Sequence, residues 1–427
     1  MKLYSTQNSK EPCPLSGSRK GLQSIRAFAN IQVNPTYAMP SLNTHPRRLL
    51  LSLAGGVVAL ALVFWLAHRQ PEPVRQSQIV PATASPKAAP AQSAANTTAR
   101  PADDADHSLQ EACEALRRES DARIIRQKLA ELRQKLAAMP TNAAVAAIRQ
   151  FLDSKADAST HLGFKLASNG TLDEAPTLRT FLLDELGRVD PAAAADYAKV
   201  VLAGMDSPDE WAVALRNLAL GDASADGLAL LEQKTAQMLG YAPWQQNPST
   251  GFLEAFDVPV YLGGTVFVPS LSQLVCSQDN PAVAHAAYLA LDRLVINNPA
   301  MVLESLEDDP DMMEGRESTR ADYFARANVS DPQQRQILES YLLDPAISTA
   351  ELQTFAGIYP NANFMVSPNL LTQASTPGHD ALMNLDAQAL AVAQEWLADP
   401  RFAQVAPELQ TITQRLEGFA AQAKQGH

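Results

Sequence analysis

The feature that most constrains this chain is an uninterrupted apolar segment near its N-terminus, Leu49–Ala67, with the sequence LLLSLAGGVVALALVFWLA. Arg47 and Arg48 precede it, and His68 and Arg69 follow it. At about 1.5 Å of rise per residue the segment forms a helix of roughly 28 Å, which matches the hydrocarbon thickness of a bilayer. It contains no charged side chain that lipid would have to bury. The sequence therefore predicts one transmembrane helix within residues 47–69.

Basic residues gather on one side of this segment. Seven Lys or Arg precede it, against one acidic residue, Glu11. By the positive-inside rule this asymmetry predicts a cytoplasmic N-terminus and a C-terminal domain outside the cytoplasm, as for a protein of a bacterial-type inner membrane with a periplasmic domain. We expect residues 1–46 to be a disordered cytoplasmic tail, and Met39 offers an alternative start.

The fate of the apolar segment after export has two interpretations, an uncleaved signal-anchor and a removed signal peptide. Trp65 lies where a cleavage site needs a small side chain, and the segment is longer than the usual core of a signal peptide. These two observations favour the anchor.

The remainder of the chain is acidic. The chain has 34 Lys and Arg and 46 Asp and Glu, of which eight and one lie in residues 1–69, so 26 basic and 45 acidic residues follow. The resulting net charge of about -19 repels phosphate backbones, which argues against nucleic-acid binding. Residues 70–107 are rich in Pro, Ala, Ser and Thr, a composition that predicts a disordered linker because it buries little apolar surface.

Residues 108–427 have the pattern of a helical domain. A helix is predicted from Ser108 to Met139, with an apolar seam at Ile125, Leu129, Leu132 and Leu136 that packs on the adjoining domain or, alternatively, pairs with a second copy. Later helices are expected to begin at a proline preceded by a capping residue, because proline loses no helical hydrogen bond there. The dipeptides with this pattern are Asp190-Pro191, Ser207-Pro208, Asn280-Pro281, Asn298-Pro299, Asp331-Pro332, Asp344-Pro345 and Asp399-Pro400.

The short turns between these segments predict antiparallel helix pairs with Ala and Leu at their contacts. Such pairing resembles HEAT or armadillo-type helical repeats, in which helix hairpins stack into a solenoid. No fixed repeat period is found, so the expected fold is all-α, as an irregular α-solenoid or helical array.

One stretch departs from the helical pattern. In residues 256–269 two segments rich in β-branched and aromatic residues flank Gly263-Gly264, a pattern that predicts a small β-hairpin insertion. Tyr261 and Phe267 are its aromatic side chains. They are candidate binding residues if the hairpin borders a groove, and core residues if it only caps the helical array.

Catalytic motifs are missing from the sequence. It contains no H-E-x-x-H, G-x-S-x-G, Walker or G-x-G-x-x-G pattern, and its histidines are scattered singly, so no metal or other cofactor is predicted. Glu339-Ser340 resembles the Glu-Ser dipeptide of soluble lytic transglycosylases, although the downstream Gly-Leu-Met-Gln of that family is missing. Cys113 and Cys276 either form one disulfide or are buried separately.

The acidic run at residues 304–314 lacks the ligand spacing of a calcium loop, and is expected to be a solvated loop in which Asp308 and Asp309 contact a basic peptide. Together these observations predict a membrane-tethered scaffold, not an enzyme, that binds a protein or peptide partner. The alternative is an envelope hydrolase that acts on peptidoglycan, as the transglycosylase resemblance implies.

Overall fold

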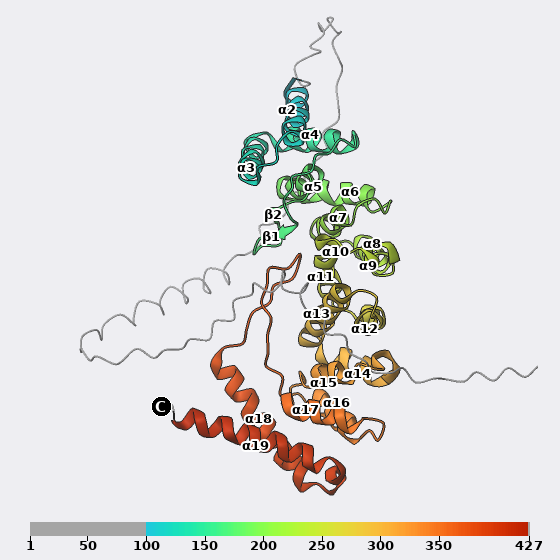
Figure 1. Cartoon of the computed structure of the whole chain (residues 1–427), viewed down its shortest axis with the longest axis vertical. Helices are drawn as coiled ribbons and strands as arrows, with labels where there is room; N and C mark the ends of the chain where they lie inside the picture. The colour runs from blue at the N-terminus through green and yellow to red at the C-terminus, as the bar shows by residue number, and fades with distance from the viewer. Residues whose placement is uncertain (1–99, 426–427) are drawn as a thin grey trace, which may run out of the picture. The chain divides into compact units, whose positions relative to one another are not determined.

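The computed structural model describes residues 100–425, with side chains over residues 107–422, and this part of the chain is mostly helical (Figure 1). The α-helices are α2 (Arg100–Arg117), α3 (Ala122–Ala138), α4 (Thr141–Asp153), α5 (Leu178–Val189), α6 (Pro191–Val201), α7 (Pro208–Gly221), α8 (Ala225–Leu239), α9 (Ala242–Gln246), α10 (Thr250–Glu254), α11 (Asp257–Leu262), α12 (Val268–Cys276), α13 (Pro281–Asn297), α14 (Pro299–Asp308), α15 (Glu317–Phe324), α16 (Pro332–Leu343), α17 (Thr349–Ile358), α18 (His379–Ala398) and α19 (Ala406–Gln425). Short 3-10 helices lie at η2 (Thr265–Phe267), η3 (Pro310–Met313) and η4 (Pro400–Val405). The strands are β1 (Lys165–Leu166) and β2 (Leu172–Glu174).

Most of the predicted proline starts are confirmed. The side chains of Asp190, Ser207, Asn280 and Asp331 each accept backbone N–H groups from the first turn of α6, α7, α13 and α16. Asp399 caps the 3-10 helix η4 in the same way, and Asn298 precedes α14 without a side-chain cap. The start predicted at Asp344-Pro345 is wrong, because α17 begins at Thr349 with Ser348 as its cap.

The helices pack against other helices that lie one to three positions away in the chain order. α6 packs against both α5 and α7, α7 also contacts α8 and α10, and α13 contacts α10, α11, α12 and α14. One continuous core of buried Leu, Ala, Val and aromatic side chains runs from Leu109 to Leu416. The structure confirms the predicted all-α class within residues 100–425, where one small two-stranded sheet accompanies the helices.

The predicted helix from Ser108 to Met139 ends where expected, since Met139 is the C-cap of α3, but its predicted start and its continuity are wrong. It begins at Arg100, inside the predicted linker 70–107, and is divided into α2 and α3. Asp121 starts α3 because its side chain accepts N–H groups from the first turn. The apolar seam is buried as predicted, and α3 packs against α2 and α4.

The predicted β-hairpin in residues 256–269 is wrong. This stretch forms α11, η2 and the start of α12, and Pro259 lies inside α11 instead of on an edge strand. Gly263 does adopt positive φ, at 71°, but as the left-handed residue that ends α11. A small antiparallel sheet lies elsewhere, where β1 pairs with β2.

The β1–β2 hairpin is held to the helices by a buried carboxylate. Asp184 of α5 accepts the backbone N–H of Leu172 at 3.0 Å and forms ion pairs with Arg216 of α7 at 2.6 Å and Arg188 at 2.9 Å. Arg216 also donates to the carbonyl of Gly170 in the turn between the strands. Because Asp184 is fully buried, these partners replace the water that its charge would otherwise require.

No helix within residues 100–425 is long and apolar enough to cross a membrane. The predicted span Leu49–Ala67, the tail 1–46 and the linker up to residue 99 lie outside the described residues.

Candidate functional site

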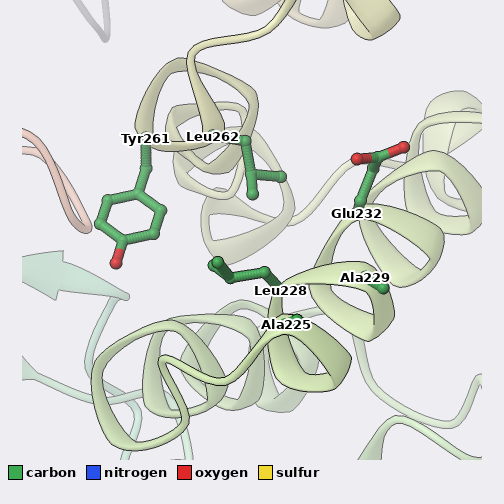
Figure 2. Close-up of a pocket in the computed structure, with 6 residues that line it drawn as sticks. All are labelled: Ala225, Leu228, Ala229, Glu232, Tyr261 and Leu262. Atoms are coloured by element: carbon green, nitrogen blue, oxygen red, sulfur yellow. The ribbon is translucent and has the colours of Figure 1, made fainter.

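A groove between α8 and α11 contains one of the predicted binding residues, Tyr261. Its volume is about 750 Å³. Figure 2 shows Tyr261 and Leu262 of α11 facing a row of α8 side chains across the gap. The lining residues are Ala225, Leu228, Ala229, Glu232, Tyr261 and Leu262.

The position of α8 follows from its first turn. Ser224 caps the helix by accepting the N–H of Gly227 at 3.0 Å, and Ser224 itself donates to Asp222 at 2.5 Å. A Cβ on Gly227 would lie 2.5 Å from the carbonyl oxygen of Asp222, so only glycine permits this close approach. These contacts direct Leu231 and Met238 into the core and leave the opposite face of α8 at the surface.

The exposed face of α8 forms one wall of the groove. Ala225, Leu228, Ala229 and Glu232 are spaced three and four residues apart, so they share a face, and all four are exposed. Leu228 is 39% exposed although it is a large apolar side chain. The wall is therefore mainly apolar, with a carboxylate at one end.

α11 forms the other wall and is held at both ends. At its C-terminus Asn298 donates to the carbonyl of Gly263 at 3.0 Å. The hydroxyl of Tyr261 donates to the carbonyl of Ala219 at 3.2 Å, which fixes the ring while leaving it 38% exposed. Since the hydroxyl has a partner within the chain, Tyr261 offers the groove mainly its aromatic ring.

The N-terminus of α11 is fixed by Asp257, whose carboxylate is almost fully buried. Arg293 of α13 pairs with it at 2.9 Å. Asp257 also accepts the backbone N–H groups of Leu371 at 2.6 Å and Thr372 at 2.8 Å, and the hydroxyl of Thr372. One carboxylate thus joins α11 to a distant segment.

That segment is the strap, residues 359–378, which connects α17 to α18 and extends back to α11 (Figure 1). Its tip also packs on the β1–β2 turn, since a Cβ on Gly170 would lie 2.5 Å from the carbonyl oxygen of Leu370. Nearer its start the strap is held by Arg326, which donates to the carbonyl of Asn361 at 3.1 Å. The strap therefore links α11, the β1–β2 turn and the residues that follow α15.

Glu254 of α10 lies close to this buried pair. Burial raises its pKa to about 7, Arg293 opposes the shift, and Asp257 adds to it. The side chain of Glu254 makes no hydrogen bond or ion pair within residues 107–422. It is therefore largely protonated below neutral pH, unlike an exposed glutamate.

The structure separates the four residues that the sequence singles out. Tyr261 lies in the groove. Phe267 is 1% exposed and belongs to the hydrophobic core. Asp308 and Asp309 are exposed at and after the end of α14, and they do not line the groove.

Sequence reasoning missed Leu228 and Glu232. The available signal was the spacing of Ala225, Leu228, Ala229 and Glu232 on one face of a helix capped by Ser224. That spacing alone does not distinguish a core face from a surface face, because Leu231 is buried on the same helix.

Metal-binding, acid–base and thiol groups elsewhere in residues 107–422 also bear on function. No group of three His, Cys, Asp or Glu there is placed to hold a metal ion. Glu339 accepts a hydrogen bond from Trp396 at 3.0 Å and pairs with Arg335 at 3.2 Å, so its carboxylate is held by partners within the chain. Cys113 and Cys276 are free thiols, so the disulfide interpretation is not supported.

Comparisons with protein-family models, curated proteins and solved structures find no match for this chain.

Proposed function

We propose that this chain is a binding scaffold that holds a protein or peptide partner in the groove between α8 and α11. The observation that carries the proposal is that two large, partly exposed side chains, Leu228 and Tyr261, line the same open cavity of about 750 Å³. Its volume falls in the usual range of ligand sites. Exposed apolar side chains that gather in a hollow mark interaction sites more often than isolated ones do.

The proposal includes the tether. Leu49–Ala67 anchors the chain in a bacterial-type inner membrane, residues 70–99 act as a spacer, and the acidic helical domain faces the periplasm. A periplasmic reporter fused after Gln70 is expected to be active, and a cytoplasmic reporter at the same place inactive. The reverse pattern would overturn the topology without affecting the groove.

A cross-linking experiment tests the groove. A benzophenone amino acid is introduced at position 228 of the full-length chain in cells, and its photoproducts are compared with those from position 343. Leu343 of α16 is the matched control, since it is also a helical leucine and is 38% exposed against 39% for Leu228. A partner adduct specific to position 228 is expected, and identical or absent adducts at the two positions would contradict the proposal.

A further inference from the structure

The groove has an unpaired negative charge at one end. Within residues 107–422, the side chain of Glu232 takes part in no hydrogen bond or ion pair. Its helical neighbours three and four positions away are Leu228, Ala229, Thr235 and Ala236, none of them cationic. Glu232 is also exposed, so its carboxylate is free to meet a cation from outside.

The nearest lysine along α8 is already occupied. Lys234 lies over the ring of Trp211 and donates to Gln237 at 3.1 Å. A second acidic residue of α8, Asp226, lies one residue beyond Ala225 and is likewise exposed and unpaired within residues 107–422. Among the residues of the α8 wall, Glu232 is acidic and none is basic, which complements a basic ligand.

The walls of the groove are both helical, which restricts the backbone of a ligand. Both lining elements are helices, so neither wall offers the continuous edge of a strand to an extended peptide. An extended ligand buried here would leave its own N–H and C=O groups without partners, whereas a helical ligand satisfies them internally. The small side chains Ala225 and Ala229 also permit another helix to approach closely.

We propose that the occupant of the groove is an amphipathic helix with a leucine-type apolar face and a Lys or Arg beside it. The apolar side chains lie among Leu228, Tyr261 and Leu262, and the cation pairs with Glu232. This inference rests on the proposed binding function and adds the chemistry of the partner.

A random peptide library tests the inference, because selection from it does not require the partner to be identified first. Phage-displayed 16-residue peptides are selected on the full-length protein, and the enriched peptides are synthesised and titrated by fluorescence anisotropy. The proteins compared are the wild type, Leu228→Asp with Leu343→Asp as its matched control, and Glu232→Lys with Glu314→Lys as its control. Glu314 is exposed like Glu232 and does not line the groove.

The expected peptides contain a Lys or Arg next to apolar residues at helical spacing, and become helical on binding by circular dichroism. Leu228→Asp is expected to weaken their affinity about tenfold or more, since it places a charge at an apolar contact. Glu232→Lys is expected to weaken it about threefold to tenfold at low salt, and less at high salt. Neither control substitution is expected to change the affinity.

Two outcomes would overturn the proposals, and they differ. If the peptides depend on Leu228 but lack basic residues, or are unaffected by Glu232→Lys, the groove is a binding site and the partner chemistry is wrong. If no enriched peptide depends on Leu228, the proposed function and the further inference both fail.

Discussion

Replacing Glu254 with Gln is expected to change the pH dependence of stability. The side chain has an ordinary pKa of 4.5 and a folded-state pKa of about 7, because burial disfavours its charged form. Between these pH values the folded chain binds a proton that the unfolded chain releases. The stabilising contribution of Glu254 to the free energy of unfolding is therefore fully present below pH 4.5 and is lost as the pH rises through 7.

The size of the effect follows from the shift. A difference of about 2.5 pKa units at about 1.4 kcal/mol per unit corresponds to about 3 kcal/mol. Since Glu254 retains some solvent contact, we expect about 2 to 3 kcal/mol of lost stability between pH 4.5 and 8.5 in the wild type. Glu254→Gln has nearly the same shape and no charge to bury. It is expected to equal the wild type near pH 4.5 and to be more stable at pH 8.5.

Urea unfolding at pH values from 4.5 to 8.5, followed by circular dichroism and tryptophan fluorescence, measures this difference. Glu232→Gln is the matched control, because it makes the same substitution at an exposed position. A Glu254→Gln difference that is constant with pH would refute the reasoning. So would a variant less stable than the wild type at pH 8.5, which would mean that ionised Glu254 is a favourable partner of Arg293.

Three further predictions concern the elements that shape the groove. Asp257→Ala leaves Arg293 and the strap without their shared acceptor, so it is expected to lower the free energy of unfolding in urea by about 3 to 5 kcal/mol. It should also increase proteolysis within residues 359–378, and an unchanged cleavage pattern would contradict this. Phe267→Ala should lower the free energy of unfolding by about 3 to 5 kcal/mol, because the ring is buried, and Tyr261→Ala by about 1 kcal/mol, because that ring is partly exposed. Equal losses would refute the assignment of Phe267 to the core and Tyr261 to the surface. Gly221→Ala places a Cβ against the carbonyl oxygen of Pro191, closer than van der Waals contact allows, so it should lower the thermal unfolding midpoint. Gly357→Ala, in α17, adds a Cβ in open space and should raise the midpoint. A rise for both variants would argue against the close α6–α7 contact.

The starts of many helices were predictable from the sequence, because capping is a local interaction. Asp190, Ser207, Asn280 and Asp331 each satisfy N–H groups two or three residues ahead, and the following proline already has a helical φ angle. Nothing beyond the first turn is needed to recognise such a start. The all-α class of residues 100–425 therefore followed from the sequence alone.

The segment 256–269 was mispredicted because tertiary packing outweighed its local preferences. Val258 and Val260 favour strands by composition, but on α11 both are buried in the core, and α11 packs on α13. Gly263 does adopt the positive φ that was expected near Gly263-Gly264, but this conformation ends helix α11 and does not form a hairpin turn. Burial depends on what the rest of the chain places nearby, which a local pattern does not contain.

The candidate site divides in the same way. Tyr261 was identifiable as an aromatic residue in an interruption of the helical pattern, but Leu228 and Glu232 became part of a site only because α8 packs beside α11. The bonds from Asp257 to Leu371 and Thr372 join residues more than a hundred positions apart. Capping and helical spacing act over a few residues and can be read along the chain, whereas the groove and the strap depend on contacts that exist only after the helices have packed.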